Sequence, residues 1–341
     1  MKVQELAFHL PNSLHATTPP ERRGIRRDYV KLMVINRHTG DVTHDSFYNL
    51  VDYLQKGDLL IVNASRTVPA VLKAQWNRGE SIVAEELEIK LAHRKGEATW
   101  EVWIANEDVK EEDVFRFTPH LYATVMDTHN RSPFVLLQFS HTGTELFHDI
   151  YSLGEPVRYE YIEQPWDLDY YQTVYATVPG SVEMPSAGRA FSWELLFKLQ
   201  KKGVRIEYVL LHTGLSYLDD KWKQAPTDNY EEYTISSDTL DRILQTRATG
   251  GKVIAVGTTV VRAIETAVAQ QSLSGWTNLY IDANYQLEAV DGLITGLHEP
   301  EASHLDMLSA FVDADRLSKA YREAITKEYL WHEFGDVNLI I

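Results

Sequence analysis

The 341-residue sequence has no cysteine and no long apolar run. The first absence excludes disulfides, a thiolate metal site and a cysteine nucleophile. The second argues against a membrane-spanning helix, which needs about 20 consecutive apolar residues. Residues Met1 to Glu5 also lack the apolar stretch of a secretory signal peptide. We therefore expect a cytoplasmic protein.

Positive charge is also scarce: 33 lysine and arginine residues face 49 aspartate and glutamate residues, a net charge of −16. Such a surface argues against indiscriminate binding of polyanions, although it does not exclude nucleic acid. Two basic clusters stand out. One contains Arg22, Arg23, Arg26, Arg27 and Lys31, several at the spacing of one helix face, and the other contains Lys198, Lys201, Lys202 and Arg205. Each is either a nucleic-acid contact or solvated surface.

The hydrophobic fraction of 44% is enough for a sizeable core and favours two domains. Apolar residues recur at helical spacing in 46–54, and 59–63 is an apolar strand. From there to about residue 140 the apolar period is two, which is typical of strands with one buried face. About seven short strands are expected in this part, among them 68–74, 87–91, 100–104, 115–117, 121–126 and 134–139. They predict a small antiparallel barrel or sandwich.

After residue 155, strands and helices alternate, which predicts an α/β sheet built in the order of βαβ units. The expected strands are 204–211, 252–256, 278–281 and 293–295, the expected helices are 238–249, 259–271 and 317–329, and a last apolar stretch is 337–341. We therefore predict an α/β fold: a discontinuous α/β/α sandwich domain (residues 1–60 and 155–341) with a small antiparallel β-barrel domain inserted at 61–154.

At Gly257 an apolar strand ends and a helix follows at once. The first N–H groups of a helix lack partners within it, so such a junction attracts an anionic group. Thr258 and Thr259 add hydroxyl groups, and Arg262 lies on the same helix face as Thr258, where it fits a carboxylate or phosphate. Glu265 could instead pair with Arg262. The pattern is equally that of an ordinary βα turn capped by threonines, and no glycine pattern of the dinucleotide or Walker type is present.

Two histidines follow expected strands. In open α/β sheets, ligands bind beyond the carboxyl ends of the strands. His212 follows one such strand, Asp282 follows another, and the segment that ends at His298 follows a third. A single histidine there is more often a surface or capping residue than a catalyst. Because two histidines occupy corresponding strand ends here, both interpretations stay open: surface or capping residues, and catalytic residues.

A series of short blocks runs in order along almost the whole chain. They are Leu10-Pro11, Arg27-Asp28, His44 with Phe47, Gly57 to Leu60, Tyr171 to Tyr175, Gly180 to Val182, Pro185 to Gly188, Ala255 to Arg262, His298, Ser309 to Phe311 and Gly335-Asp336. Singly they are weak, but in this order they resemble the S-adenosylmethionine:tRNA ribosyltransferase-isomerase family of queuosine synthesis. We interpret the chain as a diverged member of that family.

This resemblance implies an α/β domain with an inserted β-barrel, in agreement with the periodicity. It also implies that the ribosyl part of S-adenosylmethionine moves to a deazaguanine base in tRNA, with loss of adenine and methionine and epoxyqueuosine as product. S-adenosylmethionine is then a consumed substrate and tRNA the partner, and neither a metal nor a membrane is required. Such chemistry needs a base near the sulfonium, electrostatic help for the departing adenine and a pocket for the methionine zwitterion.

The family motifs also imply site residues. Those implied for the S-adenosylmethionine pocket are Gly257, Thr258, Thr259, Arg262, Ser181, Pro185, Ala187 and Gly188. Those implied for catalysis are His212, His298 and Glu231, and Asp336 matches a further family position.

Other positions depart from the family pattern. Ala190 replaces a family histidine, Pro226 and Asn229 replace two more, and the family's Asn-Phe-His-Leu-Pro-Lys is here Gly296-Leu-His-Glu-Pro-Glu301. Losing a general acid or base typically costs a factor of about 10² to 10⁴ in rate. Two further hypotheses therefore stay open. One is a paralogue that binds S-adenosylmethionine but uses another acceptor or is non-catalytic. The other is a non-catalytic RNA-binding or regulatory protein that uses the barrel and the first basic cluster.

Overall fold

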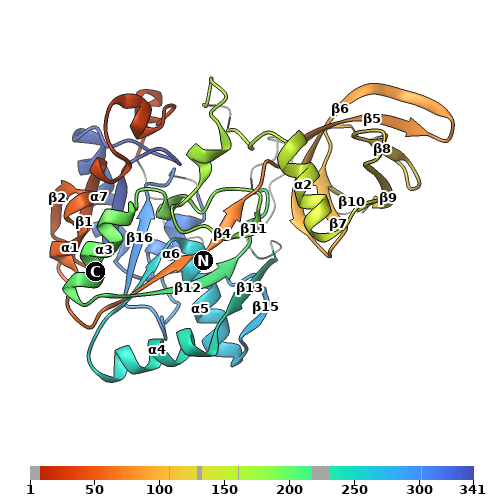
Figure 1. The fold of residues 1–341 in the computed structure, drawn as a ribbon. Helices are drawn as coiled ribbons and strands as arrows, with labels where there is room; N and C mark the ends of the chain where they lie inside the picture. Colours follow the sequence, from red (N-terminus) through yellow and green to blue (C-terminus); the bar gives the residue numbers. More distant parts are fainter. Residues whose placement is uncertain are drawn as a thin grey trace.

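The computed structural model of the protein describes residues 8–106, 108–128, 133–159, 161–216, 227, 230–300 and 302–341. Pro226, Asn229 and Glu301, three of the positions that depart from the family pattern, lie outside these residues. Figure 1 shows two parts, a large α/β part and a β-barrel set to one side of it. No helix among the described residues is long and apolar enough to span a membrane.

A nine-stranded sheet forms the centre of the α/β part. Its strands, in spatial order, are β15 (Ser274–Thr277), β13 (Glu231–Ile235), β12 (Arg205–Leu211), β3 (Leu59–Asn63), β14 (Val253–Val256), β16 (Gly292–Gly296), β17 (Val337–Ile340), β1 (Lys31–Ile35) and β2 (Val42–Ser46). Strands β12, β3, β14 and β16 are parallel, whereas β13 and β17 run antiparallel to their neighbours β12 and β16. The carboxyl ends of β12, β3, β14 and β16 therefore lie at the same edge of the sheet as the amino ends of β13 and β17.

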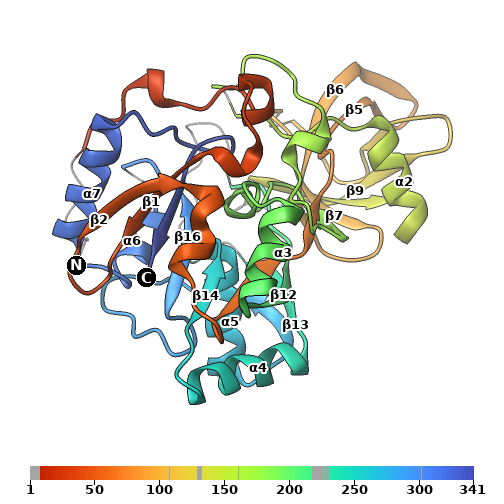
Figure 2. The same ribbon diagram turned by 60° about the vertical axis from the view of Figure 1, so that its left-hand side comes forward.

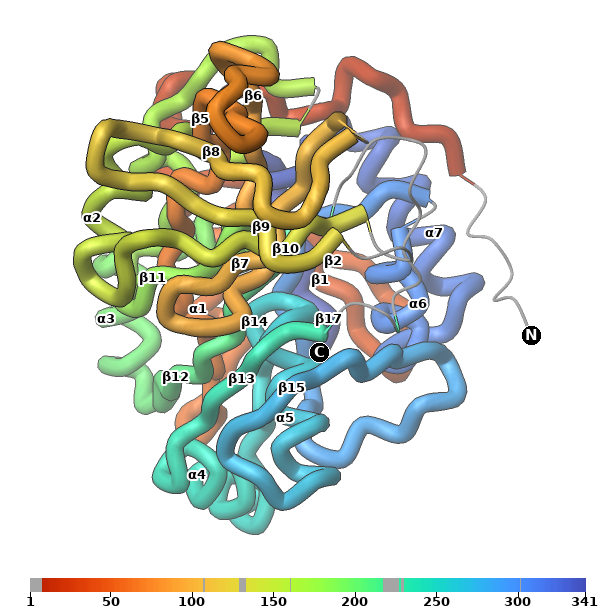
Figure 3. Tube along the Cα trace, turned by 90° about the vertical axis from the view of Figure 1, so that its right-hand side faces the viewer, coloured from red at the N-terminus to blue at the C-terminus, as the bar shows by residue number. Residues whose placement is uncertain are grey.

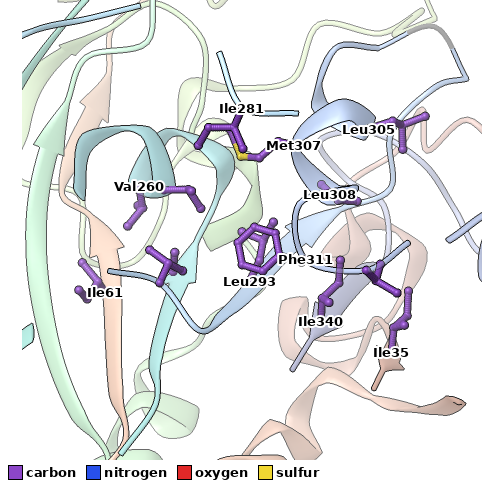
Figure 4. Close-up of a cluster of buried hydrophobic side chains, with 14 of the residues drawn as sticks. Ile35, Ile61, Val260, Ile281, Leu293, Leu305, Met307, Leu308, Phe311 and Ile340 are labelled. Atoms are coloured by element: carbon purple, nitrogen blue, oxygen red, sulfur yellow. The ribbon is translucent and has the colours of Figure 1, made fainter. Parts of the chain in front are cut away.

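Helices cover both faces of this sheet. On one face lie α4 (Ser237–Ala248), α5 (Thr258–Gln270), α6 (His304–Leu308) and α7 (Ala314–Thr326), and on the other lie α1 (Leu50–Tyr53) and α3 (Trp193–Lys202). Strand β3 is buried at every position, and its successive residues Ile61 and Val62 point to opposite faces of the sheet and belong to the two opposite cores. Figure 4 shows the first core, where Val260 of α5 and Leu308 of α6 approach the sheet. Figure 2 shows the same layers turned by 60°. The predicted α/β/α sandwich is confirmed.

The second part is a closed antiparallel barrel in the order β10-β7-β6-β5-β8-β9. The strands are β5 (Val71–Arg78), β6 (Ser81–Arg94), β7 (Thr99–Trp103), β8 (Val114–Arg116), β9 (Tyr122–Thr128) and β10 (Phe134–Phe139), followed by α2 (Gly143–Leu153). Its alternating apolar residues form one core around Trp76 and Trp100, and α2 adds Leu146 and Ile150. Figure 3 shows the barrel from the side that faces away from the sheet. The predicted inserted barrel is confirmed.

A short parallel ribbon of β4 (Ser65–Thr67) and β11 (Val178–Ser181) lies between the two parts. Strand β3 continues to Asn63, so the first three residues of the expected 61–154 insertion pair with the large sheet. On these pairings we propose that the discontinuous α/β domain (1–60 with 155–341) is interrupted by a β-barrel domain, and that the boundary falls after Asn63 rather than at residue 61.

Two local predictions were wrong. The strand expected at 278–281 lies instead at Ser274–Thr277, where β15 pairs with β13. Leu279 and Ile281 pack against the core without strand pairing, and Asp282 accepts the N–H of Asn284 at 2.9 Å in a turn. The first basic cluster does not form one helix face, because 3₁₀ helices at Pro20–Arg23 and Arg27–Tyr29 are separated by Gly24, whose φ is +83°.

The remaining 3₁₀ helices are Asn12–Leu14, Phe47–Asn49, Leu168–Tyr171 and Ser186–Gly188. The one at Phe47–Asn49 leads into the single turn of α1, so the helix expected at 46–54 is present in a shorter form.

Candidate active site

Polar side chains gather at the sheet edge where the four parallel strands end. Four of them follow the carboxyl ends of β3, β12, β14 and β16: Ser65, His212, Thr258 and His298. Two more reach the same edge at the amino ends of antiparallel strands: Glu231 begins β13, and Asp336 precedes β17. The sheet topology therefore brings together most of the residues that the sequence singled out.

The strand-to-helix junction at Gly257 needs glycine for its backbone. Its φ is +97°, a conformation that side chains disfavour, and its N–H donates to the carbonyl of Ile294 at 2.8 Å. A Cβ at this position would lie 3.5 Å from Cβ of Ala187 and 3.4 Å from Oγ1 of Thr259. Because Gly257 is itself the N-cap, no side chain caps α5. This arrangement leaves the positive end of the helix directed at the crevice rather than at a capping threonine.

Arg262 pairs with Glu231 and not with Glu265. Its Nη2 lies 2.5 Å from Oε2 of Glu231, and the two side chains are 16% and 4% exposed. The alternative that Glu265 takes Arg262 was wrong, because Glu265 accepts the backbone N–H groups of residues 288, 289 and 290 at 3.0, 3.0 and 3.1 Å. Glu231 thus belongs to the same site as the Gly257 junction.

His212 is held by two serines of the ribbon between the parts. Its Nδ1 lies 2.7 Å from Oγ of Ser65, which in turn lies 2.6 Å from Oγ of Ser181. Burial, reinforced by the positive charge of Arg94, lowers the pKa of His212 to about 4. The imidazole is therefore uncharged at neutral pH. A Cβ on Gly180 would overlap its ring, so the close approach requires glycine at 180.

His298 is fixed in a similar way at the next strand end. Its Nε2 lies 2.8 Å from Oγ1 of Thr295, and its ring stacks on that of His304, with centroids 4.6 Å apart and planes 8° from parallel. Burial, followed by the charges of His304 and His332, holds the pKa of His298 well below its usual value. No pattern in the sequence marks His304, which becomes a neighbour of His298 only through the turn before α6.

A small cavity opens beside this edge. Its wall includes Ala187, Ala190 and Gly296 from the crevice loops, and Glu333 from the chain before β17. Ala190 therefore leaves open space where the family pattern has a histidine. Burial raises the pKa of Glu333 to about 7, although a hydrogen bond from the Tyr161 hydroxyl opposes the shift.

Of the remaining predicted pocket residues, Ala187 lines this cavity, whereas Ser181, Pro185 and Gly188 are not part of its wall. Ser181 is buried within the serine pair, and Pro185 precedes the 3₁₀ helix that carries Ala187 and Gly188. A Cβ on Gly188 would overlap the hydroxyl of Tyr175, which explains the glycine.

Arg189 is a site residue that the sequence did not reveal. It is buried, its Nη2 lies 2.8 Å from Oε2 of Glu21, and its Nε donates to the carbonyl of Tyr170 at 2.8 Å. Burial lowers its pKa to about 10. Nothing in local spacing marks a residue whose partner lies 168 positions away.

Most of the first basic cluster is bound to other protein groups. Arg27 pairs with Glu21 at 3.0 Å, and Arg26 pairs with Asp28 at 2.8 Å. Nη2 of Arg23 donates to the carbonyl of Phe334 at 3.0 Å, and Nζ of Lys31 donates to two backbone carbonyls at the end of α7. These contacts weaken the hypothesis of an RNA-binding protein that relies on this cluster.

The fold and the site define an α/β protein with a cluster of polar side chains and a small cavity at its strand ends, and with an accessory β-barrel. The chain belongs to the family described as queuosine biosynthesis protein, whose profile matches residues 3–340. The resemblance seen in the sequence is thereby confirmed.

Relatives match this chain over its full length. Proteins named S-adenosylmethionine:tRNA ribosyltransferase-isomerase from Thermoanaerobacter sp. strain X514 and from Aquifex aeolicus strain VF5 are 35% and 32% identical, with 100% of both chains covered in each case. The crystal structure of S-adenosylmethionine tRNA ribosyltransferase from Thermotoga maritima has a TM-score of 0.57 and 29% identity, and covers 99% of this chain and 100% of that chain. The relatives' names describe a ribosyltransferase-isomerase, which supports a transferase or isomerase here.

Proposed function

We propose that this protein transfers the ribosyl moiety of S-adenosylmethionine to the deazaguanine precursor base in tRNA and gives epoxyqueuosine. The observation that carries the proposal is the gathering of His212, Glu231, the Gly257 junction and His298 at one sheet edge. Family membership supplies the reaction class, and the arrangement at this edge supplies groups suited to each of its requirements.

S-adenosylmethionine is placed at the start of α5. Its carboxylate lies against the first N–H groups of the helix, next to Thr258 and Thr259, because helix N-termini bind anions. The wall opposite is formed by Ala187, which already approaches Gly257. Arg262 and Glu231 form a pair of opposite charges, which matches the opposite charges of the methionine zwitterion.

The catalytic roles go to His212, His298 and Glu231. Both histidines have lowered pKa values, so at neutral pH each is uncharged and does not repel the sulfonium. The hydrogen bond between Ser65 and Nδ1 of His212 orients that ring, as a general base requires. Glu231 supplies a carboxylate next to the cationic substrate.

The proposal is tested by product release. The protein is incubated with S-adenosylmethionine and tRNA that carries the precursor base, and adenine and methionine are measured by mass spectrometry. We expect release only with that tRNA, and none with tRNA whose target position carries guanine. Absence of release at high enzyme concentration would reject the family reaction.

A second candidate function is favoured by Ala190. This residue lines the cavity and replaces a family histidine, so a general acid or base is missing from its wall. The alternative protein binds S-adenosylmethionine at the same place but uses another acceptor or is non-catalytic. Calorimetry distinguishes the two candidates, because the alternative binds S-adenosylmethionine and none of a panel of tRNAs.

A further inference from the structure

Three side chains outside the proposed catalytic set meet next to the crevice. His15, Glu299 and His332 each bring one donor atom to within 4.8 Å of the others. Nε2 of His332 lies 3.4 Å from Oε1 of Glu299, and the rings of His15 and His332 meet edge to face with centroids 4.7 Å apart. Ligands of a tetrahedral zinc ion lie roughly 3.4 Å from one another, given bonds of about 2.1 Å. The cluster is thus close to the size that one ion needs.

Backbone and indole contacts of Trp331 hold the three segments together. The N–H of Trp331 donates to the carbonyl of Leu14 at 2.8 Å, and its carbonyl accepts the N–H of Ala16 at 3.1 Å, which fixes His15 beside residue 332. Its indole Nε1 donates to the carbonyl of His298 at 3.1 Å, which fixes the residue before Glu299. Trp331 is fully buried, so this framework is rigid and places the donors in advance.

One donor atom of the cluster is buried and forms no hydrogen bond with a described residue, although it lies 3.4 Å from Oε1 of Glu299. This atom is Nε2 of His332, whose side chain is only 12% exposed. Buried polar atoms in proteins nearly always have a partner, and one without needs an explanation. The ring cannot easily turn away, because Tyr161 stacks on it with centroids 4.2 Å apart and planes 17° from parallel. A bound cation would satisfy this nitrogen.

We propose that His15, Glu299 and His332 bind a divalent transition-metal ion, and that Zn²⁺ fits best. Two imidazoles and one carboxylate are the donor set of zinc sites that keep a fourth position for water or substrate. His332 also lines the cavity, so the proposed site lies next to it.

Metal binding is measured directly, without substrate. Chelator-treated, dialysed protein is titrated with Zn²⁺ in competition with a chromophoric chelator, and Co²⁺ is added separately to record its visible spectrum. We expect one tight equivalent of Zn²⁺ and the intense Co²⁺ bands of a four-coordinate site. Glu299→Gln removes a ligand whose side chain is 52% exposed, so the fold is kept, and affinity should fall at least about 10-fold.

The control variant is His141→Gln. His141 lies 2.6 Å from Asp149 on the barrel, so its loss removes one histidine beside a carboxylate but leaves the cluster intact. We expect unchanged Zn²⁺ affinity. Three results would each overturn the proposal. They are an equal Zn²⁺ affinity of wild type and Glu299→Gln, an equal loss of Zn²⁺ affinity in both variants, and the weak Co²⁺ bands of a six-coordinate aquo ion. None of these readouts depends on turnover of S-adenosylmethionine.

Discussion

Replacing Arg262 by alanine should destabilise the protein through the partner that it leaves behind. Glu231 is 4% exposed and lies 2.5 Å from Arg262, so the variant would bury an unpaired carboxylate. Breaking a buried ion pair by removing one partner costs about 3–5 kcal/mol. We expect the free energy of unfolding, measured by urea titration at pH 7, to fall by that amount.

The double variant Arg262→Ala with Glu231→Gln separates folding from binding. With no charge left to bury, it should recover most of the lost stability, so the double-mutant cycle should give a coupling energy of at least about 2 kcal/mol. The affinity of the double variant for S-adenosylmethionine, measured by calorimetry, should stay low because the binding site has lost both of the charged side chains that face the ligand. An Arg262→Ala variant as stable as wild type would refute the buried-charge argument. A double variant that binds the ligand normally would show that the assigned site is wrong.

Three further predictions concern single residues. Ala190→His should raise the rate of adenine release by up to about 10²-fold if the family reaction operates, and an unchanged rate would favour the alternative acceptor. Glu265→Ala should lower the free energy of unfolding by at least about 3 kcal/mol, because three N–H groups in 288–290 lose their acceptor; a change below about 1 kcal/mol in urea titration would contradict this. The unfolded chain binds a proton at His212 near pH 6.5, whereas the folded pKa is about 4, so stability falls as the pH drops from 6.5 towards 4. By about pH 5 this costs roughly 2 kcal/mol, and His212→Gln should flatten the profile relative to wild type; parallel profiles would disprove it.

Elements with a clear apolar period could be predicted from the sequence. Strand β3 is buried on both faces and is a continuous apolar run, whereas the barrel strands alternate because one face lies inside. The error at 278–281 has the same origin. Leu279 and Ile281 are apolar because they pack against the core, and periodicity does not distinguish such packing from strand pairing.

The site was less predictable, because most of its contacts join distant segments. The junction at Gly257 is local, and local sequence indicated it. The partner of Arg262 is not local: Glu231 reaches it because β13 runs antiparallel to β12, and strand direction is not encoded in a short segment. The cluster of His15, Glu299 and His332 depends on the contacts of Trp331, so no spacing in the sequence reveals it.

The difference between the residues that form the core and those that form the site explains how a full-length family member can change its chemistry. The sheet and barrel depend on many buried apolar residues, and this chain matches its relatives over their whole length at 32–35% identity. The crevice depends on a few side chains at strand ends and in loops. Ala190 and Glu299 lie in those loops and not in strands, so their replacement alters the cavity wall and the charge beside it without a cost to sheet pairing. Fold similarity therefore establishes the family, whereas the reaction has to be decided at the strand-end residues themselves.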